Sequence, residues 1–221
     1  MDIKDTAVSD TVTVEMAGGI EQVQPAHFAF DDEDETAIAM HIAKYPPGKQ
    51  ASAVLPLLYI AQDRMKQTTG SAWLPVVAMN EVARRLDMPP IRVYEVATFY
   101  LMFNTTAVGT WHLQVCTTTP CWLRGSDDVV SACRAFTGIK EFGETSADGK
   151  FTMSEVECLG ACVNAPMMQV NNDFYEDLDR NSTRDLLEAL ARGTPPPIGS
   201  MKHRKGSAPE GGPTTLTTIK A

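Results

Sequence analysis

The sequence lacks the signatures of the common nucleotide-binding and hydrolytic sites. It contains no GxGxxG motif between a strand and a helix, no P-loop and no catalytic triad. Its four histidines share no spacing typical of metal ligands. We therefore expect no substrate site within this chain, so that any catalytic role depends on a partner.

The chain is also short of positive charge and of long apolar runs. Its net charge is −9, and an acidic protein repels phosphate backbones, so nucleic-acid binding is not expected. The longest apolar stretches, near residues 54–61 and 93–103, are shorter than the ~18 residues that a membrane-spanning helix needs. Any association with a membrane is therefore expected to occur through a partner and not by direct insertion.

A disulfide framework is not expected either. The N-terminus, Met1–Asp5, is acidic and lacks both the apolar segment of a secretory signal and the arginines of a transit peptide. Five cysteines, an odd number, in a chain without such a signal are more typical of reduced thiolates that bind a metal.

The first half of the chain predicts helices. At 221 residues the chain can bury one good core, or one core and a small accessory region. Residues 1–29 show no sustained periodicity and are expected to form an arm. Apolar spacing and Pro/Gly breaks in residues 30–106 predict four helices joined by short loops, hence a helical bundle, and the second helix has one apolar face formed by Val54, Leu58, Ala61 and Met65. The fourth helix, Ile91–Phe103, is apolar nearly all round, so we expect it to be buried.

The second half predicts strands and helices in alternation. Within residues 107–193, strands are expected at 110–115 and 151–157, a hairpin at 167–176, and helices capped by Ser126 and by Ser182. The order β-α-β-β-β-α predicts an α+β domain of thioredoxin-like size. Residues 194–221 are rich in Gly, Pro, Ser and Thr and are expected to form a flexible tail, in which the basic patch Lys202–Lys205 is solvated.

Four of the five cysteines form two pairs. Cys116 and Cys121 are spaced C-x4-C, Cys158 and Cys162 are spaced C-x3-C, and each pair follows a predicted strand. Because loops at strand ends converge at one edge of a small α/β sheet, we expect the pairs to form a single site. Thr and Pro in the first loop favour a tight, non-helical path, and Gly160 in the second permits a sharp turn close to an inorganic ion.

Four thiolates without a histidine partner favour two kinds of metal site. One is a [2Fe–2S] cluster with two cysteines on each iron, and the other is zinc held by all four cysteines. The C-x4-C spacing occurs in iron–sulfur loops, whereas zinc ribbons more often use C-x2-C twice, so the spacing favours the cluster without deciding the question. Thiol–disulfide chemistry is less favoured, because the C-x2-C redox spacing is absent.

Three segments carry a family resemblance. Val93–Tyr100 (VYEVATFY), Val115–Cys121 (VCTTTPC) and Glu155–Pro166 (EVECLGACVNAP) together resemble the 24 kDa-type [2Fe–2S] subunit of respiratory NADH:ubiquinone oxidoreductase, complex I. Trp73–Pro75 and Tyr175–Leu178 fit the same pattern. The resemblance implies a helical N-terminal part followed by a thioredoxin-like [2Fe–2S] ferredoxin domain. It further implies that one [2Fe–2S] cluster is held by Cys116, Cys121, Cys158 and Cys162.

The resemblance also implies partners and a location. The main partner is a larger NADH-binding flavoprotein subunit that carries FMN and a [4Fe–4S] cluster, with other peripheral-arm subunits nearby. The chain would exchange single electrons with that FMN, away from the main route to quinone. Its expected place is peripheral, on the matrix side of the mitochondrial inner membrane or on the cytoplasmic face of a bacterial one. The alternatives are the equivalent subunit of an NAD-dependent hydrogenase or formate dehydrogenase, and a zinc-stabilised interaction module.

Four further residues each have two interpretations. Cys133 lies on the apolar face of its predicted helix, and we expect a buried small hydrophobe and not a fifth ligand. Arg124 either offsets the charge of the cluster or is solvated. Met167 and Met168 either shield the cluster or pack as an ordinary strand pair in a core.

Overall fold

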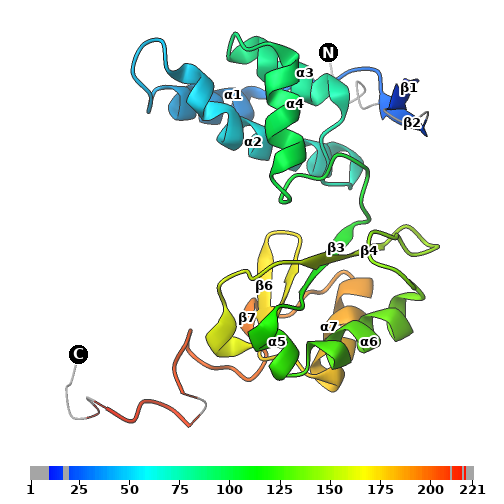
Figure 1. Ribbon diagram of the computed structural model, residues 1–221, viewed down its shortest axis with the longest axis vertical. Helices are drawn as coiled ribbons and strands as arrows, with labels where there is room; N and C mark the ends of the chain where they lie inside the picture. The colour runs from blue at the N-terminus through cyan, green and yellow to red at the C-terminus, as the bar shows by residue number, and fades with distance from the viewer. Residues whose placement is uncertain (1–9, 17–19, 210, 216, 218–221) are drawn as a thin grey trace. The chain divides into compact units, whose positions relative to one another are not determined.

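The protein folds into two compact units, residues 1–108 and 109–221 (Figure 1). The structure, a computed structural model, describes residues 10–16, 20–209, 211–215 and 217. The secondary structure is mixed, with helices in both units and the larger sheet in the second. Among the described residues, no helix has both the length and the apolar character required to span a bilayer.

A β-hairpin opens the described part of the first unit, where the sequence predicted no regular element. β1 (Thr11–Met16) pairs antiparallel with β2 (Ile20–Pro25), and the rest of the expected arm, residues 1–9 and 17–19, lies outside the described residues. The buried Gln24 accepts a hydrogen bond at 2.7 Å from the Val76 N–H at the start of a helix. That N–H has no partner within its own helix, so the contact both caps the helix and anchors the hairpin.

Four helices share the core of the first unit. They are α1 (Asp32–Ile42), α2 (Val54–Thr69), α3 (Val76–Arg85) and α4 (Pro90–Phe99), and a 3₁₀ turn, η2 (Gln50–Ala53), precedes α2. The apolar face expected on the second helix is confirmed as buried, and its members are Val54, Leu58, Ala61 and Met65.

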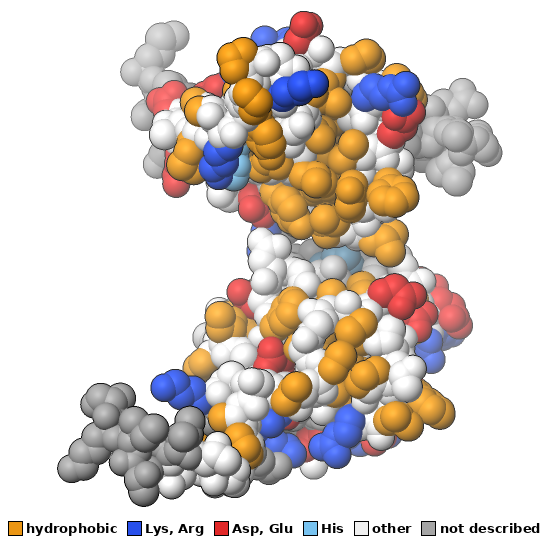
Figure 2. All heavy atoms as spheres, turned by 60° about the vertical axis from the view of Figure 1, so that its left-hand side comes forward, with side chains coloured by type: hydrophobic (Ala, Val, Ile, Leu, Met, Phe, Trp, Pro, Cys, Tyr) orange, Lys and Arg blue, Asp and Glu red, His pale blue; other side chains and the backbone are white. Residues whose placement is uncertain are grey.

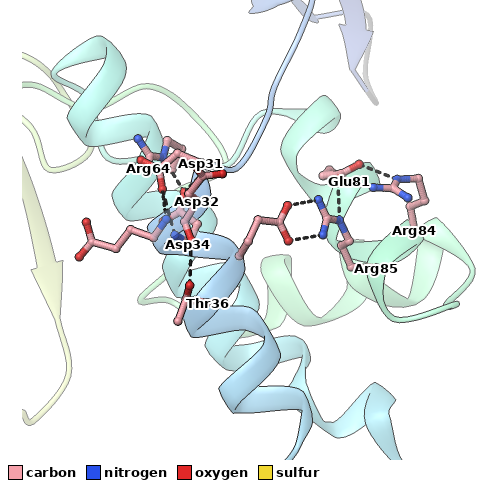
Figure 3. Close-up of polar contacts among 10 residues, drawn as sticks. Asp31, Asp32, Asp34, Thr36, Arg64, Glu81, Arg84 and Arg85 are labelled. Carbon is pink, nitrogen blue, oxygen red and sulfur yellow. Dashed lines mark hydrogen bonds and ion pairs between the residues drawn. The ribbon is translucent and has the colours of Figure 1, made fainter. Parts of the chain in front are cut away.

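Ion pairs join the acidic start of α1 to the neighbouring helices (Figure 3). Asp31 caps α1 through a capping box with Asp34. Arg64 on α2 pairs with both of these carboxylates, at 2.6 Å to Asp34. Arg85 on α3 makes a two-pronged contact with Glu35. The acidic run therefore serves as a cap and also as a tertiary anchor.

The expectation that the fourth helix is buried is wrong. α4 ends at Phe99, and its buried residues are Val93 and Ala97. Phe99 and Leu101 are 75% and 77% exposed, and Ile91 is also exposed. Figure 2 shows hydrophobic side chains gathered on the surface of this unit. Apolar spacing does not distinguish burial in the chain's own core from an apolar surface, which explains the error.

The second unit is built on a five-stranded sheet in the order β4-β3-β5-β6-β7. Within this sheet, β3 pairs parallel with β4 on one side and antiparallel with β5 on the other. The strands are β3 (Trp111–Cys116), β4 (Phe151–Val156), β5 (Met168–Val170), β6 (Asp173–Glu176) and β7 (Gly199–Ser200).

Two helices pack side by side against this sheet (Figure 1). They are α6 (Ser126–Thr137) and α7 (Arg180–Ala191). Both predicted caps are wrong. Gly125, at φ +99°, occupies the N-cap of α6. Asp179 caps α7, because its carboxylate accepts a hydrogen bond at 2.8 Å from the Ser182 N–H while Ser182 Oγ accepts one from the Asp179 N–H.

The predicted flexible tail is wrong for residues 199–208. β7 pairs parallel with β6, and the Met201 N–H donates to Glu176 O at 2.9 Å. The side chain of Arg204 is 10% exposed and pairs with Asp177 at 2.5 Å, so this member of the basic patch is not solvated. Composition misled the prediction, because the partner of Arg204 lies on a different part of the chain.

Candidate metal centre

The two cysteine pairs come together at one edge of the sheet, as expected. Cys116 is the last residue of β3 and lies in register with Val156, the last residue of β4. Cys158 follows two residues later. Because β3 and β4 are parallel, both strands end at the same edge of the sheet, where loops commonly form binding sites.

The first pair is buried. Cys116 and Cys121 are 1% and 2% exposed, and they pack against Ala165 and Met167. Cys121 lies in a short helix, α5 (Thr119–Leu123), so the expected non-helical path is wrong. The proline in this loop stands at the first turn of α5, where a missing N–H removes no helical hydrogen bond.

The second pair is exposed. Cys158 Sγ and Cys162 Sγ lie 3.3 Å apart, and both residues are exposed. Gly160 between them has φ +86°, a conformation that favours glycine. The Gly160 N–H donates to the Cys158 sulfur, and this bond lowers the pKa of that thiol. Cys162 opens a 3₁₀ turn, η3 (Cys162–Asn164).

Thr118 links the two pairs. Its hydroxyl lies 3.3 Å from Cys116 Sγ. The same hydroxyl hydrogen-bonds Cys158 and lowers the pKa of that thiol, although less than the Gly160 N–H does. Cys162 also interacts electrostatically with Cys116. Thr118 therefore contacts one cysteine of each pair.

Protonation differs between the thiols. The pKa of Cys121 is raised to about 12, chiefly by burial and in part by a contact with Cys116, while a hydrogen bond from the Met167 N–H lowers it. The neighbouring Cys158 raises the pKa of Cys162. Metals bind the thiolate, so metal binding to the buried pair is coupled to loss of a proton from Cys121.

The donor set fits a [2Fe–2S] cluster. Such a cluster takes two thiolates on each iron, and the site offers two pairs of thiols, all five cysteines of the chain being free. Within the part of the chain that the structure describes, no three or more His, Cys, Asp or Glu side chains form a group suited to a single metal ion. A dinuclear cluster does not require such a group, because its ligands are divided between two irons.

The other residues singled out in the sequence lie in different environments. Met167 packs against the buried cysteine pair, whereas Met168 belongs to the main core of the sheet. Arg124 is exposed at the end of α5. Cys133 is fully buried in the main core, and burial raises its pKa to about 12. The prediction that Cys133 is a buried small hydrophobe is therefore confirmed.

Sequence reasoning missed a polar network behind the second pair. Asn164, 4% exposed, donates through Nδ2 to Glu176 Oε2 at 2.5 Å and to Gly206 O at 2.9 Å. Arg204 Nη2 donates to Asn164 Oδ1 at 2.5 Å, and the same guanidinium pairs with Asp177. A signal was present, since Asn164 and Asp177 both stand in segments that carry the family resemblance.

Comparison with protein families gives a direct match. The family model for the thioredoxin-like [2Fe–2S] ferredoxin matches residues 38–191. A subunit of the NADH-quinone oxidoreductase of Rickettsia conorii is 53% identical over 164 residues, which cover 74% of this chain and 95% of that protein. The mitochondrial NADH dehydrogenase [ubiquinone] flavoprotein 2 of Dictyostelium discoideum is 48% identical over 189 residues, covering 86% of this chain and 74% of that protein.

A solved structure shares the fold. An NAD⁺-reducing [NiFe]-hydrogenase in the air-oxidised state matches with a TM-score of 0.53 at 20% identity. The match covers 64% of this chain and 23% of the hydrogenase chain, so it concerns one part of a much longer protein. The family model and the two relatives confirm the resemblance drawn from the cysteine segments: the chain belongs to the thioredoxin-like [2Fe–2S] ferredoxin family, whose cofactor is a [2Fe–2S] cluster, alongside the matching subunits of bacterial and mitochondrial NADH dehydrogenases.

Proposed function

We propose that this chain is the [2Fe–2S] electron-transfer subunit of an NADH-quinone oxidoreductase. Its cluster is held by Cys116, Cys121, Cys158 and Cys162 and exchanges single electrons with the FMN of a larger NADH-binding flavoprotein subunit. The observation that carries the proposal is the meeting of the two cysteine pairs at one edge of the sheet, bridged by Thr118. The activity belongs to the complex, and this chain acts as one of its subunits.

The chain's own groups prepare this site for a negatively charged, redox-active centre. When bound, the cluster supplies a place for one electron. The N–H groups of Met167 and Gly160 donate to Cys121 and Cys158, and such bonds to sulfur stabilise negative charge on it. Met167 and Ala165 exclude water from the buried pair. These contacts set how readily the site accepts an electron.

The exposed second pair suits electron exchange with a partner. Cys158 and Cys162 are exposed, and Trp122, Leu123 and Val163, near the cysteines in sequence, are 58%, 71% and 69% exposed. Exposed apolar side chains near a redox centre favour close docking of a second protein. The helical bundle of the first unit, with Phe99 and Leu101 exposed, is the further docking surface that we propose for the flavoprotein or for other peripheral-arm subunits.

The relatives support a proposal for the location of the chain. The matched proteins are bacterial and mitochondrial. We infer a peripheral position in the complex, on the matrix side of the mitochondrial inner membrane or on the cytoplasmic face of a bacterial inner membrane. In either compartment, the chain would meet NADH only through its flavoprotein partner.

A second candidate assembly is an NAD-dependent hydrogenase or formate dehydrogenase. The fold shared with the NAD⁺-reducing hydrogenase supports it. The respiratory assembly is favoured because the Rickettsia conorii protein is 53% identical over 95% of its length, against 20% identity to the hydrogenase.

Spectroscopy with cysteine variants tests the ligand assignment. The purified chain should absorb visible light and give an EPR signal after reduction. Cys116→Ser and Cys158→Ser should bleach the cluster or change its spectrum, because each removes one thiolate. Cys133→Ser is the matched control, since this buried cysteine belongs to the other core and should leave the spectrum unchanged.

Two results would overturn the assignment. A colourless protein with one zinc per chain would favour the structural zinc site. Loss of the cluster in Cys133→Ser alone would show that the four ligands were chosen wrongly. Copurification with a larger flavoprotein that contains FMN would in turn support the electron-transfer role.

A further inference from the structure

The C-terminal segment folds back onto the unit that carries the cysteines. After β7, Ser200 Oγ donates to Asp177 Oδ2 at 2.6 Å and accepts from the N–H groups of Lys202 and Arg204, each at 3.2 Å. Met201 packs against the main core. This segment is therefore built into the fold and brings Arg204 to a defined place.

Arg204 makes an unusually complete set of contacts. Its Nε donates to Asp177 Oδ2 at 2.8 Å and its Nη2 to Asp177 Oδ1 at 2.5 Å. The same Nη2 reaches Val163 O at 3.1 Å and Asn164 Oδ1 at 2.5 Å, and Nη1 reaches Ala208 O at 3.0 Å. The arginine and aspartate side chains are only 10% and 7% exposed. A planar guanidinium suits this geometry, which an ammonium group does not reproduce.

These contacts end on the turn that begins with Cys162. Val163 and Asn164 complete η3. The Asp177 N–H donates to Asn164 O at 2.7 Å, so Asp177 holds the turn through its backbone as well as through Arg204. The second cysteine pair is exposed, whereas the first is buried. The contacts of Arg204 therefore support a cysteine loop that lies at the surface.

We propose that Arg204 is a positioning residue for the [2Fe–2S] site: with Asp177 and Asn164 it clamps the turn that carries Cys162 and so fixes the geometry of the exposed cysteine pair. Asp177 balances the charge of Arg204, so Arg204 acts through geometry more than through charge. The proposal rests on the ligand assignment given under Proposed function. It assigns a role to the C-terminal segment, which composition alone predicts to be a flexible tail.

The test uses the full-length chain carrying its cluster, with four proteins compared: wild type, Arg204→Ala, Arg204→Lys and Lys205→Ala. Lys205 is the matched control because it is the neighbouring cation and is exposed. The first readout is the rate at which a colorimetric iron chelator removes iron from the native protein. The second is the EPR spectrum of the reduced cluster, and thermal unfolding monitors the fold.

Loss of an outer-shell partner typically weakens a metal site by about 10–100-fold. We therefore expect Arg204→Ala to release iron about 10-fold faster than wild type or more, with shifted EPR g-values. Arg204→Lys, which keeps the charge but loses the forked geometry, should be intermediate. Lys205→Ala should match wild type in both readouts.

Each outcome decides the question. If Arg204→Ala folds and matches wild type in iron release and in EPR, the proposal is refuted. A lower unfolding temperature with an unchanged EPR spectrum would show a purely structural role, which also refutes it. If Arg204→Ala does not fold, Arg204→Lys decides by the same two readouts. If wild type itself shows no [2Fe–2S] spectrum, the proposed function fails instead, so the two failures are distinguishable.

Discussion

The thiols of this chain should differ widely in their rate of alkylation in the folded apoprotein. Cys158 is exposed, and the Gly160 N–H lowers its pKa below the ordinary value of 9.0. Cys133 is fully buried, and burial raises its pKa to about 12. Because the thiolate is the reactive form, iodoacetamide at about pH 8 should label Cys158 first.

The expected ratio follows from ionisation. At about pH 8, a thiol with a pKa of about 12 is roughly 1 part in 10⁴ thiolate, whereas one with a pKa below 9 is at least about 1 part in 10. This is a difference of about 1,000-fold. A more basic thiolate is the better nucleophile, and this favours Cys133. With a Brønsted coefficient of about 0.4–0.5, the expected difference in rate is reduced by about 20-fold. Ionisation and nucleophilicity together therefore predict a rate ratio on the order of 50-fold, before steric shielding of Cys133 is added.

Peptide mass spectrometry over a time course of alkylation measures both rates in one sample. Circular dichroism confirms that the apoprotein is folded, and the same experiment in urea is the control, in which the two rates should converge. Equal labelling of Cys133 and Cys158 in the folded chain would refute the reasoning, because it would mean that Cys133 is not buried.

Three further predictions test other parts of the molecule. Leu101→Ser should weaken binding to the proposed flavoprotein partner by about 1–3 kcal/mol, measured by calorimetry, and leave the unfolding temperature unchanged, because Leu101 is 77% exposed. Ile198→Ser, at 66% exposure in the other unit, is the control, and an equal effect of both would count against docking through the exposed Phe99 and Leu101. Leu57→Ala should lower the free energy of unfolding in urea by about 2–5 kcal/mol, because Leu57 is fully buried; a change below about 1 kcal/mol would contradict this packing. Burial opposes ionisation of Asp177, but the hydrogen bonds from Arg204 and Ser200 outweigh it and lower its pKa below 3.8. The contribution of Asp177 to stability is therefore present above about pH 4 and is lost as the pH falls through the lower, folded-state pKa. Asp177→Asn should lower the free energy of unfolding at neutral pH by about 3–5 kcal/mol, and the variant should lose less stability than wild type on acidification. Parallel profiles of stability against pH for the two proteins would argue against the ion pair with Arg204.

The composition and spacing of the sequence predicted where the two cysteine pairs lie in the fold. Two cysteine pairs after two strands implied one shared centre, and the parallel pairing of β3 with β4 brings them to one edge. The inward face of α2 and the burial of Cys133 were also predicted, since both are expressed in local periodicity. The choice between iron–sulfur and zinc came from the surrounding segments and not from the cysteines.

The remaining features depend on contacts between distant parts of the chain. Gln24 caps α3 from 52 positions away, and Arg204 pairs with Asp177 across 27 positions. Periodicity and composition report only on neighbours within a turn or a strand, so neither contact has a local signature. Burial of α4 was mispredicted for a related reason. An apolar helix is expected to contact another apolar surface, but its sequence does not specify whether that surface belongs to the same chain.

By itself, the sequence determined the mixed fold class, the position of the two cysteine pairs after two strands, and the family, because each is expressed in local spacing and in short motifs. Only the tertiary structure decided that the first cysteine pair is buried while the second is exposed, and that the C-terminal segment closes over the turn of Cys162. The physical reason is that burial and ion pairing are properties of the space around a residue. That space is filled by segments from distant parts of the chain, and the local sequence does not indicate which segments these are.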